Sequence, residues 1–310
     1  MKKMPALLAM VTTAVAGTSV SLMLVSQAAP PASGPADPVI VAAGDIACPN
    51  EPCPDNWATA DLITQLDPTA VLALGDTQYP AGDIVDFRNS YDLTWGRFLG
   101  RTYPVPGNHE YQSSPSADGY FEYFGERAFG PKGWYSFNLG EWHLIALNSR
   151  KGREPPSDAQ LAWLETDLAA DDSRCQLAFW HHPRWSSGVE HGSNANMGAF
   201  WRVLHADRVD VVLNGHEHNY ERFKPMLPNG TYTQGGIRQF VVGTGGIGDD
   251  YGFQDPPLEN SYRRLNAIGL LELELHPGSY EWRFMQADGF TRDPGHSWCH
   301  GPEPVPTTEP

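Results

Sequence analysis

The sequence has few basic residues, few cysteines and almost no long apolar segments. Its 310 residues include 21 Lys and Arg against 37 Asp and Glu, which gives a formal net charge of −16 at pH 7. Such an acidic chain disfavours adhesion to nucleic acid and to anionic membranes, so we expect no nucleic-acid-binding surface. An anionic substrate would need a local positive centre that overcomes the field of the whole molecule.

The extended apolar segment of the chain lies at its start. "MKKMPALLAMVTTAVAGTSVSLMLVSQAAP" begins with basic residues, and threonine, serine and glycine dilute its apolar part. This is more typical of an export signal than of a transmembrane anchor. We therefore predict a signal peptide over residues 1–28, with cleavage near Ala28 or Ala29. The mature protein is expected to be secreted and to have no membrane span.

The chain has four cysteines: Cys48, Cys53, Cys175 and Cys299. An even number of cysteines in an exported protein predicts two disulfides. One pairing closes a short loop between Cys48 and Cys53 and leaves Cys175 to bond Cys299, although the count alone leaves the other pairings open. A zinc site is the alternative, but the spacings lack the usual paired pattern.

Short apolar strands alternate with helical patterns along most of the chain, and the last third is rich in strands. This alternation predicts a mixed α/β domain built in layers. Ser157 is the expected N-cap of one helix, with Gln160 completing a capping box. Helices are expected over residues 56–66, 86–99, 157–170 and 196–206, and a hairpin over residues 133–149.

We expect a single domain, because the sequence shows no internal repeat and no second region with its own pattern. The domain should occupy residues 39–300, after a linker over residues 29–38. The last ten residues, 301–310, are rich in proline and polar residues, which predicts a disordered tail.

Side chains that can bind metals follow the ends of five buried strands. In four of them a glycine comes directly before the polar residue, as in "VAAGD", "LALGD", "PVPGN" and "VLNGH". Glycine lets the backbone turn tightly and approach a neighbour closely. Because active sites of α/β sheets lie beyond the carboxyl ends of strands, we expect these side chains to share one rim. They are Asp45, Asp76, Asn108, His181 or His182, His216 and, two residues further on, His218.

Each of these residues alone would more often be a turn residue or a packed side chain. Together they provide two carboxylates, an amide oxygen and three imidazoles, which is more than one ion needs. Oxygen donors mixed with imidazoles suit divalent or trivalent first-row metals rather than a structural thiolate site. The sequence therefore predicts two metal ions at this rim.

Five motifs occur in the order found in calcineurin-like metallophosphoesterases: "GDIA", "GDTQY", "GNHE", "HHP" and "GHEHNYER". The tyrosine of "GDTQY" and the "YER" resemble the purple acid phosphatases in particular, in their small single-domain form. The resemblance covers Val39 to Phe284 and implies a layered α/β/β/α sandwich of two mixed sheets flanked by helices. "GDIA" departs from the many relatives with glycine as the fourth residue, but it keeps Asp45.

The resemblance also implies a role for each residue of the rim. Tyr79, whose phenolate is a hard anionic donor, fits a ferric ion beside a divalent ion of iron, zinc or manganese. His109 and His191 match the family's outer histidines, which contact the phosphate and help the leaving group depart. The implied ligands of one metal are Asp45, Tyr79 and His218, those of the other are Asn108, His181 and His216, and Asp76 bridges the two.

These residues together imply a secreted phosphatase that hydrolyses phosphate monoesters by attack of a metal-bound hydroxide. A phosphodiesterase or nucleotidase on the same metal site is the alternative enzyme, and the substrate is a small phosphate ester in each case. A non-catalytic phosphate-binding protein is a further alternative, against which the complete ligand set argues. The chain has no "GxSxG" motif that would indicate a serine nucleophile.

Two further patterns are given structural interpretations. "GTGGIG" over residues 243–248 fits the dinucleotide-binding pattern, but the "DDYGFQDPP" that follows cannot begin a helix. We interpret this segment as a glycine-rich loop that lines the rim. Glu221 and Arg222 of "YER" are interpreted as a structural ion pair.

Overall fold

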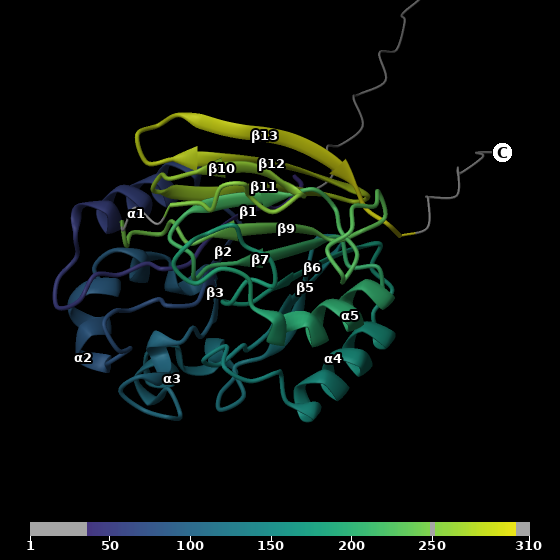
Figure 1. Ribbon diagram of the computed structural model, residues 1–310. Coiled ribbons are helices and arrows are strands. Elements are labelled where there is room, and N and C mark those ends of the chain that lie inside the picture. The colour runs from purple at the N-terminus through teal and green to yellow at the C-terminus, as the bar shows by residue number, and fades with distance from the viewer. Residues whose placement is uncertain (1–35, 249–251, 302–310) are drawn as a thin grey trace, which may run out of the picture. The chain divides into compact units, whose positions relative to one another are not determined.

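Two mixed β-sheets form the centre of the protein, seen here in a computed structural model (Figure 1). The structure describes residues 36–248 and 252–301. The predicted signal peptide over residues 1–28, most of the predicted linker, and the predicted tail from Pro302 onward lie outside the described residues.

The first sheet has six strands in the order β13-β12-β11-β1-β2-β3. Strands β1, β2 and β3 run parallel, and β11 pairs antiparallel with β1. All five residues of β2 are buried, as expected for a parallel strand that is covered on both faces. The strands are β1 (Val39–Ala43), β2 (Ala70–Leu74), β3 (Thr102–Val105), β11 (Gly269–His276), β12 (Ser279–Gln286) and β13 (Thr291–Trp298).

The second sheet has seven strands in the order β10-β8-β9-β7-β6-β5-β4. Strands β5, β6, β7 and β9 run parallel, whereas β4, β8 and β10 pair antiparallel with their neighbours. The strands are β4 (Tyr135–Leu139), β5 (Trp142–Ala146), β6 (Cys175–Phe179), β7 (Val211–Asn214), β8 (Tyr220–Phe223), β9 (Arg238–Val242) and β10 (Ser261–Leu265).

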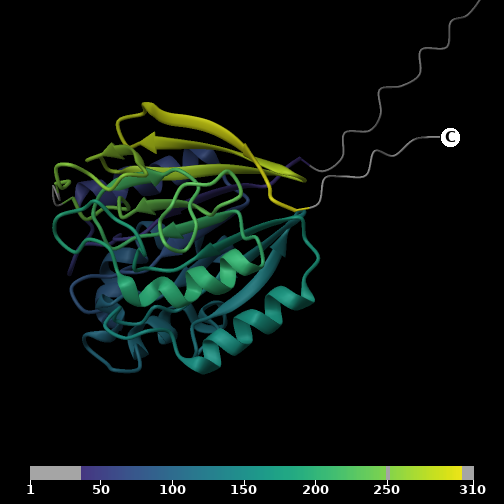
Figure 2. The same cartoon turned by 45° about the vertical axis from the view of Figure 1, so that its right-hand side comes forward.

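Helices cover the outer faces of the two sheets. Figure 2 shows α4 (Asp158–Ala170) and α5 (Gly198–Ala206) side by side along the second sheet, where Leu164 and Trp201 are buried. On the first sheet, α1 (Pro54–Leu66) packs against β11. This arrangement confirms the predicted α/β/β/α sandwich. The remaining helical segments are α2 (Ile84–Asp86), η1 (Phe87–Tyr91), η2 (Trp95–Arg101), η3 (His109–Tyr111), α3 (Asp118–Phe124), η4 (Gly125–Ala128) and η5 (Ala195–Met197).

The helix expected over residues 86–99 is broken into short pieces, so that prediction is wrong as a continuous element. A π-helical turn forms η1, and a 3₁₀ helix forms η2. The backbone N–H of Tyr91 donates to Gln78 Oε1 (3.1 Å). Thr94, with φ −111° and ψ −90°, has left the helical region. The buried aromatic side chains of this segment are thus placed by tertiary packing rather than by a regular helix.

The N-cap of α4 is confirmed, but the capping box is wrong. Ser157 Oγ accepts a hydrogen bond from the backbone N–H of Gln160 (3.3 Å). The Gln160 side chain instead accepts from Asn148 N (2.8 Å) and donates to Asn148 O (2.9 Å). It therefore fastens the start of α4 to the segment that follows β5.

The structure contains two disulfides, Cys48–Cys53 and Cys175–Cys299. Their partners are separated by 5 and 124 residues, respectively. The longer one joins the first residue of β6, in the second sheet, to the residue that follows β13, in the first sheet. Over residues 36–248 and 252–301, each helix is too short or too polar to cross a membrane.

Candidate metal centre

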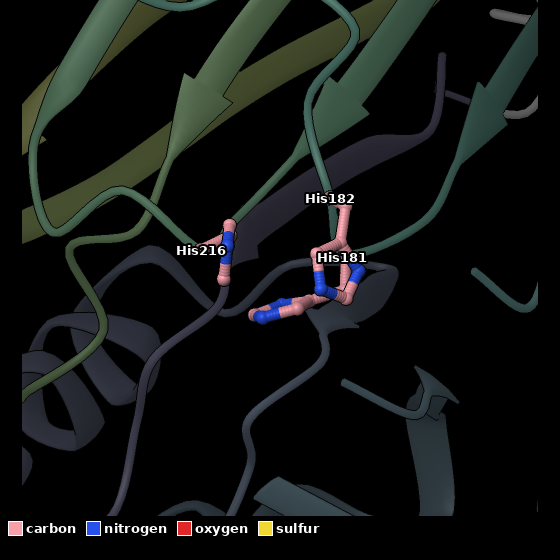
Figure 3. Close-up of side chains that lie close together, drawn as sticks. All are labelled: His181, His182 and His216. Carbon is pink, nitrogen blue, oxygen red and sulfur yellow. The ribbon is translucent and has the colours of Figure 1, made fainter. Parts of the chain in front are cut away.

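The parallel strands of both sheets end at a common edge. From the first sheet, Asp45 follows β1 and Asp76 follows β2; from the second sheet, His181 follows β6. One donor atom from each of these residues lies within 4.8 Å of the other two, and all three side chains are buried. Figure 3 shows His181 close to His216, which follows β7. The predicted rim therefore exists, and it joins the two sheets.

The turns at this rim hold three polar residues in the left-handed backbone region. Asp45, Asp76 and His216 have φ values of 59°, 45° and 75°. This conformation costs a non-glycine residue about 1–2 kcal/mol. At Gly75 a Cβ atom would lie 2.7 Å from the Cβ of His181, so glycine here provides the space for another side chain of the rim. The surrounding fold thus imposes strained turns that aim these side chains at one another.

Asp45, Tyr79 and His218 form a tight triangle of donor atoms. Tyr79 Oη lies 3.0 Å from Asp45 Oδ1 and 3.0 Å from His218 Nε2, and the last two atoms are 3.3 Å apart. Asp76 Oδ2 lies 3.3 Å from Tyr79 Oη. Neighbouring donors that bind one first-row metal at about 2.1 Å are roughly 3 Å apart. The separations in this triangle therefore fit a single metal ion.

A second group of donors surrounds the other side of Asp76. His181 Nε2 lies 3.1 Å from Asp76 Oδ2, while its Nδ1–H donates to the backbone carbonyl of Leu74 (2.9 Å). That hydrogen bond fixes the ring so that Nε2 faces the carboxylate. Asn108 Oδ1 is buried and has no hydrogen-bond partner among the described residues, which is costly unless a ligand takes that place. With His216, these side chains fit a second cation next to the first.

His182 lies beside this group, and one of its ring nitrogens lies within 4.8 Å of donor atoms of His181 and His216. Its Nδ1 is 2.8 Å from Ser149 Oγ, and a Cβ on Gly152 would lie only 2.6 Å from its Nε2. Its ring centroid is nevertheless 4.3 Å from that of His216. His182 thus packs against Ser149 and Gly152 beside the two predicted ligands, and its assignment as the middle residue of "HHP" stays a prediction.

Charge is tightly paired in the centre of the site. Burial by itself would raise the pKa of Asp76, but the charge and hydrogen bond of His181 outweigh it and hold that pKa well below its ordinary value. Burial would likewise lower the pKa of His181, but the Asp76 carboxylate raises it to about 9. Without a cation the site thus keeps a proton on His181, which a metal ion bound at Nε2 would displace.

Two other donors have pKa values that bear on metal binding. Burial, followed by the neighbouring imidazoles, lowers the pKa of His216 well below its ordinary value, so the ring is neutral and ready to ligate. Burial and the carboxylates of Asp45 and Asp76 raise the pKa of Tyr79 well above its ordinary value. A phenolate at Tyr79 therefore requires a strong positive charge beside it.

A cavity of about 350 Å³ opens above these donors, and both predicted outer histidines line it. His109 Nδ1–H donates to the carbonyl of Pro80 (2.5 Å), and its Nε2 lies 3.8 Å from Asp76 Oδ2. The ring of His191 stacks on that of His216, with centroids 4.2 Å apart. Burial lowers the pKa of His191. Both imidazoles can therefore contact a ligand bound in the cavity.

Glu110, which the sequence analysis did not single out, is a buried support for this rim. Its carboxylate accepts hydrogen bonds from the backbone N–H groups of Asp76 (3.0 Å), Thr77 (2.8 Å), Gln78 (3.2 Å) and Gly107 (2.6 Å). It also accepts from the Thr77 hydroxyl (3.0 Å). One side chain thus locks the turn after β2 to the turn after β3.

Glu217 has a similar role on the other side of the site. It accepts hydrogen bonds from the backbone N–H groups of His191 (2.8 Å) and Gly192. Its carboxylate lies so close to Gly188 that a Cβ there would collide with it. Glu110 and Glu217 both lie next to metal-capable residues in the motifs "GNHE" and "GHEH", and that position was the signal that could have revealed them.

Glu221 and Arg222 do not pair with each other, so the predicted ion pair is wrong. They are consecutive residues of β8 and point to opposite faces. Glu221 accepts from Ser187 N (2.7 Å) and Ser261 Oγ (2.5 Å), whereas the Arg222 guanidinium forms a two-point contact with Asp293 (2.7 Å for each bond).

The glycine-rich loop lies against the rim as expected. The backbone N–H of Gly245 donates to Gly44 O (2.9 Å), and that of Ile247 donates to Asp45 O (3.0 Å). Ile247 also lines the cavity above the donors. The loop therefore supports the turn that carries Asp45.

Comparisons with known proteins place this geometry in a family. The calcineurin-like phosphoesterase profile matches residues 38–220, which is more than half of the chain. Purple acid phosphatase 21 of Arabidopsis thaliana is 30% identical over 211 residues, covering 61% of this chain and 46% of that protein. The chain thus spans about half the length of such relatives.

Solved structures show the same fold. Purple acid phosphatase PPD1 from yellow lupin (Lupinus luteus) seeds superposes with a TM-score of 0.68 at 21% identity, covering 84% of this chain and 53% of that one. GAP50, described as the anchor in the inner membrane complex of Plasmodium, superposes with a TM-score of 0.64 at 13% identity, covering 85% and 89%. Because the family profile spans the residues that form the rim from Asp45 to His218, this chain belongs to the calcineurin-like phosphoesterase family.

Proposed function

We propose that this protein is a secreted phosphatase that hydrolyses phosphate monoesters with two metal ions, a ferric ion and a divalent ion of iron, zinc or manganese. The triangle of Asp45, Tyr79 and His218, with Asp76 beside it, is the observation that carries this proposal. Asn108, His181 and His216 would hold the second ion, and Asp76 would contact both. The acidic chain gains in this way the local positive centre that an anionic substrate requires.

Two bound metal ions would neutralise charge on the phosphoryl oxygens and lower the pKa of a water molecule. The protein's part is to hold the donors rigid through Glu110 and the strained turns, and to bind the ester in the cavity above them. No covalent intermediate on the protein is needed. The leaving alkoxide must then receive a proton.

His109 is placed to deliver that proton. Its ring lines the cavity, and its Nδ1–H is held by the Pro80 carbonyl, so a proton for the leaving group would have to come from Nε2. His191, stacked on His216, would contact the same phosphate from the other side.

Metal analysis together with a visible absorption spectrum tests the proposed centre. We expect about two metal ions per chain and a charge-transfer band from the tyrosinate to ferric iron. Tyr79→Phe should abolish the band, whereas Tyr120→Phe should retain it, because Tyr120 is a buried tyrosine whose hydroxyl has no partner among the described residues. A colourless protein that contains only zinc or manganese would overturn the assignment of a ferric ion, but it would leave the proposed hydrolase activity in place.

A second assay separates the monoesterase from its nearest alternative. We expect an aryl phosphate to be hydrolysed much faster than the corresponding bis-aryl ester. The opposite preference would favour a phosphodiesterase or nucleotidase activity at the same site. Absence of turnover of both esters by the metal-loaded protein would favour a phosphate-binding protein instead.

We further propose that residues 39–300 form the catalytic domain and that the chain is exported by its first 28 residues. Both disulfides fall within those limits and suit an oxidising compartment. N-terminal sequencing of protein recovered from the culture medium should give a start near Pro30. An intact first residue would contradict export by cleavage.

A further inference from the structure

A second cavity, of about 550 Å³, has four positively charged residues in its lining. Lys132, Arg150, Lys151 and Arg153 line it, with Glu154 as the single acidic residue among the lining side chains. The whole chain has 37 acidic residues against 21 basic ones. The charge balance of this cavity is therefore the reverse of that of the protein.

The cavity adjoins the proposed metal centre through His182. Ser149, which lines the cavity, holds His182 Nδ1 at 2.8 Å, and Gly152 packs against the same ring. On its other side, the His182 ring lies 4.3 Å from His216. A single layer of side chains thus separates the basic cavity from the predicted metal ligands.

The loop that carries three of the four cations is fixed in place. The carbonyl of Gly152 accepts hydrogen bonds from Asn194 Nδ2 (2.9 Å) and Asn196 Nδ2 (3.0 Å). Arg150 N–H donates to Asn148 Oδ1 (2.8 Å), which fixes the start of the loop. A fixed loop loses less conformational entropy when it binds a ligand, so it can discriminate between ligands.

The cations themselves are available for a ligand. Within the described part of the chain, no carboxylate forms an ion pair with any of the four. Arg150 rests over the ring of Tyr111, 5.3 Å from its centroid, and Lys132 Nζ lies 5.7 Å from the centroid of Trp134. Aromatic faces orient a cation without neutralising it, which leaves its charge for an anion.

We propose that this cavity binds the second phosphate of a bisphosphate ester whose first phosphate is hydrolysed at the metal centre. This inference rests on the proposed phosphatase function and names its substrate class: small esters with a second phosphate separated from the scissile one by several bonds. The two cavities share no lining residue, and the buried side chains of Ser149 and His182 lie between them. The ester must reach around these side chains, so its linker needs several bonds. Arginine and lysine side chains are the residues that bind phosphate oxygens most strongly.

A matched pair of substrates tests the inference. Hexane-1,6-diyl bisphosphate and hexyl phosphate differ only in the second phosphate. For the metal-loaded wild-type protein we expect kcat/KM to be higher for the bisphosphate on the order of tenfold. In the triple variant Arg150→Gln, Lys151→Gln, Arg153→Gln, that ratio should fall to about twofold, the statistical value for two equal phosphates, mainly through KM.

A control variant separates the local effect from the change in net charge. Arg202→Gln, Lys224→Gln, Arg263→Gln removes the same number of positive charges, and none of these residues lines either cavity. It should keep the wild-type ratio. A wild-type ratio in the Arg150, Lys151, Arg153 variant would overturn the inference while leaving the phosphatase in place.

Failure of the proposed phosphatase function would look different. The wild-type protein would then hydrolyse neither ester. A binding measurement would in that case test whether the basic cavity holds a second phosphate. Calorimetric titration with hexane-1,6-diyl bisphosphonate and hexylphosphonate, whose C–P bonds are not hydrolysed, should show on the order of tenfold tighter binding of the bisphosphonate. This difference should disappear in the triple variant, and its persistence there would overturn the inference.

Discussion

The two ends of strands β6 and β7 serve different purposes. At their carboxyl ends, His181 and His216 reach the proposed metal centre, and the turn at His216 has a φ of 75°. At their amino ends, Cys175 is bonded to Cys299, and Asp210 accepts hydrogen bonds from the backbone N–H groups of Gln176 (2.9 Å) and His300 (2.6 Å). One end is strained and carries donors for a ligand, whereas the other fastens the two sheets together.

This difference shows how one sheet can carry both stability and chemistry. Strained turns and an unpaired acceptor such as Asn108 Oδ1 lower the stability of the rim. The disulfide and the Asp210 hydrogen bonds at the amino ends of β6 and β7 compensate for this loss of stability, and they do not contact the proposed metal centre. Substitutions at the rim should therefore change turnover, and substitutions at the amino ends should change stability alone.

The largest effect on turnover is expected for Asp76→Asn. The variant keeps the shape of the side chain but loses the negative charge that is proposed to contact both metals. We expect kcat to fall by a factor of about 10³ or more, measured with an aryl phosphate under saturating metal. Asp210→Asn, the same change at the amino end of β7 in the second sheet, should keep turnover per folded molecule near the wild-type value. Equal losses in both variants would remove the distinction between the two ends.

Glu110→Gln should affect turnover and stability together. The carboxylate serves five donors, and a glutamine would turn its NH₂ group toward some of them. We expect a loss of about 3 kcal/mol in the free energy of unfolding, measured in urea, and a kcat about 10²-fold lower. Glu122→Gln, at an exposed ion pair with Arg88, should cost less than about 1 kcal/mol. Unchanged stability of the Glu110 variant would show that the rim is held by other contacts.

Glu217→Ala should have a smaller effect, confined to the His191 side of the site. Loss of the acceptor for His191 N–H and Gly192 N–H frees the loop that carries the His191 ring. We expect kcat/KM to fall by roughly tenfold, which is less than the contribution of about 10²-fold or more from a general acid or base, because the His191 ring is loosened rather than removed. Glu217→Gln retains an acceptor oxygen and should restore most of the activity. If the glutamine variant is as poor as the alanine variant, the negative charge rather than the hydrogen bond matters.

The smallest effect on turnover is expected for Asp210, where the response should appear in the pH dependence of stability. Burial raises the pKa of Asp210 to about 7, above its ordinary value of 3.8. The folded protein therefore holds an extra proton between about pH 4 and pH 7, and its stability should fall as pH rises through that window. Asp210→Asn should flatten this part of the curve of unfolding free energy against pH, with hydrolysis unchanged. An identical slope in both proteins would contradict the raised pKa.

The rim could be predicted from sequence because its signal is local. A buried strand, a glycine and a metal-capable side chain are adjacent in the chain, and parallel strands bring such ends to one edge. Asp45, Asp76 and His216 were found in this way. The sequence could not reveal that the positive φ falls on these residues themselves, because the close packing of the two sheets imposes that strain.

Other features depend on contacts between distant segments. Gln160 lies at the third position of α4 and fits a capping box, but the backbone of Asn148 offers it two hydrogen bonds instead. Arg222 pairs with Asp293, 71 residues further along the chain, rather than with its neighbour Glu221. Strand β13 is mixed polar and apolar and contains Pro294, so it lacks the alternating pattern that identifies a strand.

The hydrogen bond from His216 N–H to Asp45 Oδ2 (2.7 Å) joins residues that are 171 positions apart, one from each sheet. A chain in which only one sheet has formed offers either mostly oxygen donors or mostly imidazoles. Neither set alone provides the mixed donors of the proposed metal centre. High affinity for the proposed ions should therefore arise late, when the two sheets dock. The metal content of a preparation should consequently report the fraction of molecules that completed maturation.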